Sequence, residues 1–148
     1  MPRRRGSGHD CRRSRRLRRL LVTARPHGRK IILVIDDEAP IRKIMDRLLK
    51  QYGYETLLAD SGDEGIRLFN AYEQDIALVL LDWNLPGVTG KQILATMIDR
   101  RPDLRVIVVT GGFEATTDEH ATQDTASILL KPFTPTELML AVRTVLEA

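Results

Sequence analysis

Short apolar runs alternate with amphipathic segments from residue 31 onward, and this alternation restricts the fold more than any other feature of the sequence. Three runs are rich in β-branched side chains: Ile31–Ile35, residues 76–81 and residues 106–109. Runs of this length without polar alternation are typical of strands that are buried on both faces of a parallel sheet. Weaker strand signals occur at Glu55–Ala59 and at residues 127–130. The pattern therefore predicts five parallel strands.

Helical periodicity fills the intervals between these runs. Ser61, Thr89 and Thr134 each precede a Glu or Gln by three positions, the capping-box spacing that begins a helix. Pro135 suits the first position of a helix, and Gly53 suits a helix end. The apolar stripes comprise Ile41, Ile44 and Leu48; Ile66 and Phe69; and Leu138, Val142 and Val145. A further helix, with few apolar residues, is expected at residues 113–123. Strands followed by helices predict an α/β doubly wound sheet with one core.

Polar side chains follow four of the predicted strands. Asp36 and Asp37 end the first strand, Asp82 the third, Thr110 the fourth and Lys131 the fifth. In a doubly wound sheet these strand ends meet at one edge, where ligands bind. Clustered carboxylates repel one another, and a hard cation with oxygen ligands, Mg²⁺ above all, would relieve that repulsion. No His or Cys lies near these positions in the sequence, which argues against zinc.

Each of these residues also has an ordinary structural interpretation. Asp37 could cap the next helix, Asp82 could begin an Asx-turn, and Lys131 could be a surface lysine. Their convergence at one sheet edge favours a phosphoryl site.

Four motifs, in this order and spacing, resemble the receiver domain of two-component response regulators. They are Ile-Leu-Val-Ile-Asp36-Asp37-Glu, Leu-Leu-Asp82-Trp-Asn-Leu-Pro-Gly, Val-Val-Thr110-Gly-Gly and Leu-Lys131-Pro-Phe. The resemblance covers residues 31–148. It implies a flavodoxin-like doubly wound fold with five helices and the strand order 2-1-3-4-5.

The resemblance implies that Asp82 is the phosphoacceptor, which takes a phosphoryl group from the phosphohistidine of a histidine kinase or a phosphorelay protein. Asp37, Asp82 and the backbone carbonyl of Asn84 would bind Mg²⁺, and Asp36 would contribute through water. Asn84 would also adjust how fast the acyl phosphate is hydrolysed.

The resemblance also implies roles for the last two strand ends. Lys131, followed by a cis peptide bond to Pro132, would pair with the phosphoryl oxygens, and Thr110 would hydrogen-bond one of them. Gly111 would leave room for the phosphoryl group, and Gly112 would tune hydrolysis. In one departure from the family, Ile128 stands where many relatives carry Tyr or Phe. Aromatic switching at that position is therefore in doubt.

No output module follows the predicted receiver, so we expect a single-domain, cytoplasmic regulator without a membrane span that contacts a downstream protein. Two alternatives stay open. One is a Mg²⁺-dependent phosphohydrolase using the same carboxylates, although such enzymes usually have a second Asp where this chain has Asn84. The other is a receiver whose basic leader binds nucleic acid, which we regard as the weaker alternative.

The leader, residues 1–30, has a charge opposite to that of the rest of the chain. It holds 12 of the 23 Lys and Arg residues and only one of the 20 acidic residues, so residues 31–148 carry a net charge of −8. Three interpretations remain. The leader could bind phosphate backbones or anionic membranes, form a disordered tail, or not belong to the native protein.

Overall fold

The computed structural model describes residues 30–112 and 126–147. Within these residues, strands and helices alternate as predicted, except that most of the segment between the last two strands lies outside them. In chain order they are β1 (Ile31–Ile35), α2 (Ala39–Gln51), β2 (Glu55–Ala59), α3 (Gly62–Ala71), β3 (Ile76–Asp82), α4 (Gly90–Arg100), β4 (Val106–Thr110), β5 (Ala126–Leu130) and α6 (Pro135–Glu147). All five predicted strands are present. β1 and β2 have the predicted bounds, and β3, β4 and β5 are each one residue longer.

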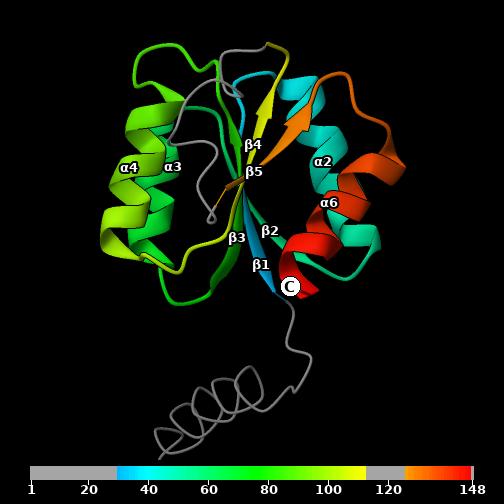
Figure 1. The fold of residues 1–148 in the computed structure, drawn as a ribbon, viewed down its shortest axis with the longest axis horizontal. Coiled ribbons are helices and arrows are strands. Elements are labelled where there is room, and N and C mark those ends of the chain that lie inside the picture. Colours follow the sequence, from blue (N-terminus) through cyan, green and yellow to red (C-terminus); the bar gives the residue numbers. More distant parts are fainter. Residues whose placement is uncertain (1–29, 113–125, 148) are drawn as a thin grey trace, which may run out of the picture.

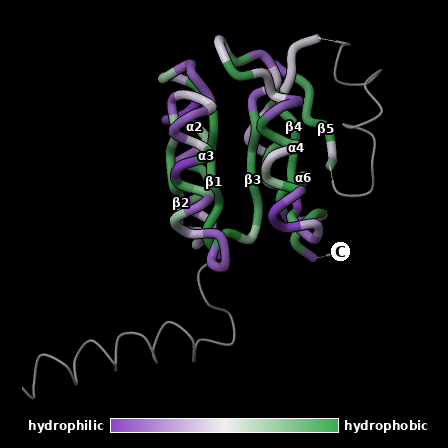
Figure 2. Tube along the Cα trace, turned by 90° about the vertical axis from the view of Figure 1, so that its left-hand side faces the viewer, coloured by the Kyte–Doolittle hydropathy of each residue, from purple (hydrophilic) through white to green (hydrophobic). Residues whose placement is uncertain are grey.

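The strands form one parallel sheet in the order β2-β1-β3-β4-β5, so the predicted order is confirmed. Helices α3 and α4 cover one face of the sheet, and α2 and α6 cover the other (Figure 1). The sheet forms the apolar centre of the domain, and the hydrophilic residues of the helices lie toward the outside (Figure 2). Because all strands are parallel, their carboxyl ends lie along one edge, as a site built from strand ends requires.

Two apolar cores fill the spaces between the sheet and the helix layers. Phe69 of α3 and Met97 of α4 pack against one face, while Met45 of α2 and Val142 of α6 pack against the other. The buried faces of β1, β3 and β4 supply the partners on both sides, which is why their sequences are continuously apolar.

The predicted stripe on α2 is partly wrong. Ile41 and Leu48 are half-buried as expected, but the side chain of Ile44 is 53% exposed, and the buried residues of this helix are Met45 and Leu49. Both sets have helical spacing, so the sequence pattern alone could not decide which face turns toward the sheet.

The predicted helix ends are confirmed by backbone hydrogen bonds. Thr89 and Gln92 form both bonds of a capping box, and the hydroxyl groups of Ser61 and Thr134 each accept a bond from the backbone N–H three residues later. Helix α6 begins at Pro135, and Gly53 follows the end of α2 at a φ of 89°.

Two predicted segments lie outside the described residues: the helix at 113–123 and nearly all of the basic leader. Among the helices that the structure describes, none has the length and apolar character needed to cross a membrane.

The close approach of α4 to the β3–α4 loop generates a stability prediction. A Cβ atom on Gly90 would lie 2.9 Å from the Cα and carbonyl oxygen of Trp83, which are backbone atoms that cannot easily move. We expect Gly90→Ala to lower the free energy of unfolding by about 1–3 kcal/mol, as overpacking does. Urea denaturation measures this change.

Gly111→Ala is the matched control for that substitution. Among the residues that the structure describes, a Cβ atom on Gly111 would meet only the Cβ of Lys131, at 3.9 Å, so we expect a change within about 0.5 kcal/mol. Equal losses of stability in the two variants would contradict the steric argument.

Candidate functional site

The ends of β1 and β3 carry two aspartates in the same local geometry. One carboxylate oxygen of Asp36 accepts a hydrogen bond from the backbone N–H of Glu38 at 2.8 Å. One carboxylate oxygen of Asp82 likewise accepts from the backbone N–H of Asn84 at 3.1 Å. These are the Asx-turns to which Asp residues at strand ends are suited. Each turn occupies the Oδ1 atom and leaves Oδ2 for a second partner.

Lys131 supplies that second partner from the end of β5. Its Nζ atom lies 3.2 Å from Oδ2 of Asp36, 3.6 Å from Oδ2 of Asp82 and 3.9 Å from Oε1 of Glu38. The Lys131 side chain is largely buried, and the two aspartates are almost fully buried. The Lys131–Pro132 peptide bond is cis, as the resemblance implied.

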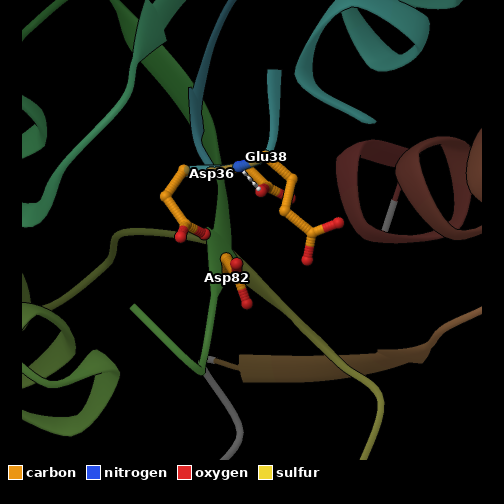
Figure 3. Close-up of side chains that lie close together, drawn as sticks. Asp36, Glu38 and Asp82 are labelled. Carbon is orange, nitrogen blue, oxygen red and sulfur yellow. Dashed lines mark hydrogen bonds between the residues drawn. The ribbon is translucent and has the colours of Figure 1, made fainter. Parts of the chain in front are cut away.

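Four carboxyl groups gather at this edge. One oxygen atom each of Asp36, Asp37, Glu38 and Asp82 lies within 4.8 Å of the others. Figure 3 shows the side chains of Asp36, Glu38 and Asp82 close together at the strand ends, with the hydrogen bond from the Glu38 N–H to Asp36 as a dashed line. Glu38 is not among the predicted site residues, because it lies at the start of α2 rather than at a strand end. The N-cap residue of α2 is Glu38, not Asp37.

Burial and crowding change the protonation of this cluster. Burial raises the pKa of Asp82 to about 6, and the neighbouring carboxylates of Asp36 and Asp37 also raise it. The N–H of Asn84 and the ammonium group of Lys131 oppose this rise without cancelling it. Burial by itself would lower the pKa of Lys131, yet the carboxylates of Asp82 and Asp36 hold it above its ordinary value. Lys131 therefore stays charged, and the cluster still lacks positive charge.

This donor set fits a hard divalent cation. All four cluster groups are carboxylates, and Lys131 is the one cation among the described residues that pairs with them, so the cluster has more negative than positive charge when the carboxyl groups are ionised. Mg²⁺ prefers a few carboxylate oxygens together with water, and the exposed Asp37 offers such a ligand beside the buried Asp82.

Thr110 and the glycines after it complete the strand-end set. The hydroxyl group of Thr110, which is fully buried, accepts a hydrogen bond from the backbone N–H of Gly112 at 3.2 Å. The backbone N–H of Lys131 donates to the carbonyl of Thr110 at 2.8 Å, which ties the ends of β4 and β5 together. The structure thus places Thr110 beside Lys131 but directs its hydroxyl group to its own loop.

The described residues thus form a parallel α/β sheet with buried aspartates, a threonine and a lysine at the ends of four of its strands. The family model for the response regulator receiver domain matches residues 32–143, and this chain belongs to that family.

Relatives with known names agree with this assignment. The chain is 31% identical over 115 residues to the transcriptional regulatory protein ResD of Bacillus subtilis, covering 78% of this chain and 47% of ResD. It is 34% identical over 129 residues to the phosphate regulon transcriptional regulatory protein PhoB of Pseudomonas aeruginosa, covering 79% of this chain and 52% of PhoB. The chain thus spans about half the length of these curated relatives.

Solved structures show the same fold. A response regulator receiver domain protein from Clostridium thermocellum superposes with a TM-score of 0.73 at 33% identity, covering 79% of this chain and 94% of that one. The response regulator TrrA of Thermotoga maritima, solved in complex with Mg²⁺-BeF, gives a TM-score of 0.70 at 28% identity, covering 78% and 98%.

The raised pKa of Asp82 predicts a pH-dependent stability difference between the metal-free wild type and Asp82→Asn. Because the folded pKa of about 6 exceeds the ordinary 3.8, the folded state holds the Asp82 proton more tightly. The free energy of unfolding of the wild type therefore falls as the pH rises through this range. We expect Asp82→Asn to be more stable by about 2 kcal/mol above pH 7, with little difference near pH 4. Urea denaturation in EDTA measures this, and a pH-independent difference would contradict it.

Proposed function

We propose that this receiver accepts a phosphoryl group on Asp82 from the phosphohistidine of a histidine kinase or a histidine phosphotransfer protein. The observation that carries this proposal is the placement of the Asp82 carboxylate, which is 3% exposed and 3.6 Å from the ammonium group of Lys131 within a cluster of carboxylates. A nucleophilic oxygen held beside a fixed positive charge suits phosphoryl transfer, in which positioning and electrostatics do most of the catalysis.

The residues that would hold Mg²⁺ are Asp37, Asp82 and the backbone carbonyl of Asn84, with Asp36 acting through water. The burial of Asp36 and its contact with Lys131 suit this indirect role, whereas the exposed Asp37 suits direct ligation. When bound, the ion supplies charge neutralisation at the phosphoryl oxygens.

Asp82 attacks the phosphorus with a carboxylate oxygen, and Lys131 pairs with the negative charge of the transferred group. Thr110 would exchange its bond with Gly112 for one to a phosphoryl oxygen. A charge-assisted hydrogen bond of this kind contributes about 1.5–3 kcal/mol, less than the roughly 5.5 kcal/mol that a complete two-state shift requires. Lys131 and the repacking of neighbouring residues therefore contribute to any switch.

The output in this proposal is contact with a downstream protein, not turnover of an external substrate. ResD and PhoB are transcriptional regulators, and this chain matches about half of each. We therefore take from them only a regulatory role, and not their action on transcription. Each Asp82 side chain would carry one phosphoryl group, so labelling would saturate at one group per chain.

Labelling with a small phosphodonor tests the phosphoacceptor. We expect Mg²⁺-dependent phosphorylation of the wild type by radiolabelled acetyl phosphate and its loss in Asp82→Asn, because the amide is not a nucleophile. Intact-mass spectrometry checks the stoichiometry. Asp60→Asn is the matched control, since Asp60 follows β2 at the same sheet edge but is exposed. It should label like the wild type, and equal labelling of Asp82→Asn would disprove the assignment.

Metal binding can be measured without phosphorylation. Trp83 is the only tryptophan of the chain and follows Asp82 directly, so its fluorescence should report Mg²⁺ binding. We expect Mg²⁺ to raise the thermal unfolding midpoint, because it binds the folded state. Asp37→Asn should weaken binding about tenfold or more, and Asp60→Asn should leave it unchanged. An unchanged dissociation constant in Asp37→Asn would exclude Asp37 as a ligand.

A further inference from the structure

Glu38 differs from the other carboxylates of the cluster in its exposure. Its side chain is 57% exposed, whereas Asp36 and Asp82 are 0% and 3% exposed. Its backbone is fixed, because its N–H donates to Asp36 and its carbonyl accepts from the N–H of Arg42. A carboxylate on a fixed backbone at the open side of a buried site acts on whatever approaches that site.

The contacts of the Glu38 side chain do not indicate a role in stabilising the fold. Glu38 is the N-cap residue of α2, yet its side chain makes no capping hydrogen bond. Within the described part of the chain, its one ion pair is with Lys131 at 3.9 Å, beyond hydrogen-bond distance. The carboxylate therefore contributes charge to the site and little to the stability of the fold.

That charge opposes the negative charge of a phosphodonor. The charged groups around Glu38 in the described elements are the three aspartates and Lys131. Arg42, one turn further along α2, directs its guanidinium group to the Asp36 carbonyl at 2.8 Å. Asp37 and Asp82 belong to the proposed Mg²⁺ ligands, and Asp36 is paired with Lys131. Glu38 is then the exposed carboxylate of this cluster that nothing neutralises fully.

We propose that Glu38 is a specificity-determining residue that selects phosphodonors by charge. It disfavours dianionic acyl phosphates relative to N-phosphoryl donors of lower net charge, the class to which phosphohistidine belongs. The inference rests on the proposed phosphoacceptor function and concerns the donor that this same site prefers.

The chemical step is the same for both donor classes. A carboxylate oxygen of Asp82 forms a bond to phosphorus and yields an aspartyl phosphate. With acetyl phosphate the P–O bond to the acetyl group breaks, and its electron pair leaves with acetate. With phosphoramidate, whose nitrogen is protonated, the P–N bond breaks and ammonia leaves with that pair. The donors differ by about one unit of negative charge near neutral pH, so their comparison isolates the charge effect.

The test compares Glu38→Gln with the wild type at saturating Mg²⁺. Two unit charges about 8 Å apart in a water-like medium change a rate by about twofold. Removing the Glu38 charge should therefore raise the rate constant about four- to fivefold for acetyl phosphate and about twofold for phosphoramidate. Both gains should shrink at high salt, because ions screen exposed charges. Asp99→Asn, which removes an exposed carboxylate at the far end of α4, should change neither rate.

Equal gains for the two donors, or no gain, would overturn the proposal, since only a charge effect scales with donor charge. Trp83 fluorescence supplies a second readout that does not depend on phosphorylation. We expect Glu38→Gln to keep its Mg²⁺ dissociation constant within about threefold of the wild type. A loss as large as that of Asp37→Asn would make Glu38 a metal ligand and would also overturn the proposal.

The failure of this inference is distinguishable from that of the proposed function. If the wild type is labelled on Asp82 and donor preference is unchanged in Glu38→Gln, only the role of Glu38 is wrong. If neither donor labels the wild type, the phosphoacceptor assignment fails and the role of Glu38 fails with it.

Discussion

The ammonium group of Lys131 holds together a sheet edge at which two strands end in buried carboxylates. Burying an ionised carboxylate costs several kcal/mol unless a partner of opposite charge compensates it, and here one lysine serves both Asp36 and Asp82. The lysine lies 95 residues beyond Asp36 in the chain, so it reaches the carboxylates only when β5 completes the sheet. Formation of the site thus depends on formation of the whole fold.

One lysine does not balance the negative charge of the carboxylates at this sheet edge. The remaining negative charge is what suits the site to bind a cation. The pKa of Asp82 stays raised although Lys131 lies 3.6 Å away. A cluster that remains short of positive charge favours cation binding, and a bound cation favours the transfer of an anionic group to Asp82. Repulsion among these carboxylates lowers the stability of the metal-free fold, and the same repulsion would favour the binding of Mg²⁺. Some loss of stability is therefore inherent in a site of this kind.

The sequence predicts the sheet better than the details of the site, for a physical reason. Strands buried on both faces must be apolar throughout, so runs such as Ile31–Ile35 mark their own bounds, and the residues that follow them must lie at the sheet edge. The sequence determines less strongly which face of a helix packs against the sheet. Ile44 and Met45 both fit the helical periodicity of α2, and only packing buries Met45 rather than Ile44. Glu38 joins the cluster through the Asx-turn of Asp36, a geometry that the motif alone does not specify.

The link between β4 and β5 limits how phosphorylation could change the surface of this domain. Thr110 accepts a bond from the N–H of Lys131 through its carbonyl and one from the N–H of Gly112 through its hydroxyl group. If Thr110 turns toward a phosphoryl group, the bond to the N–H of Gly112 is lost. Ile128, paired with Val108 in the sheet and packed against the core, is β-branched and stiff about χ1, and it has no ring to reorient. In this chain the proposed signal would therefore depend on the hydrogen bonds of Thr110 to Gly112 and Lys131 rather than on rotation of an aromatic side chain on β5.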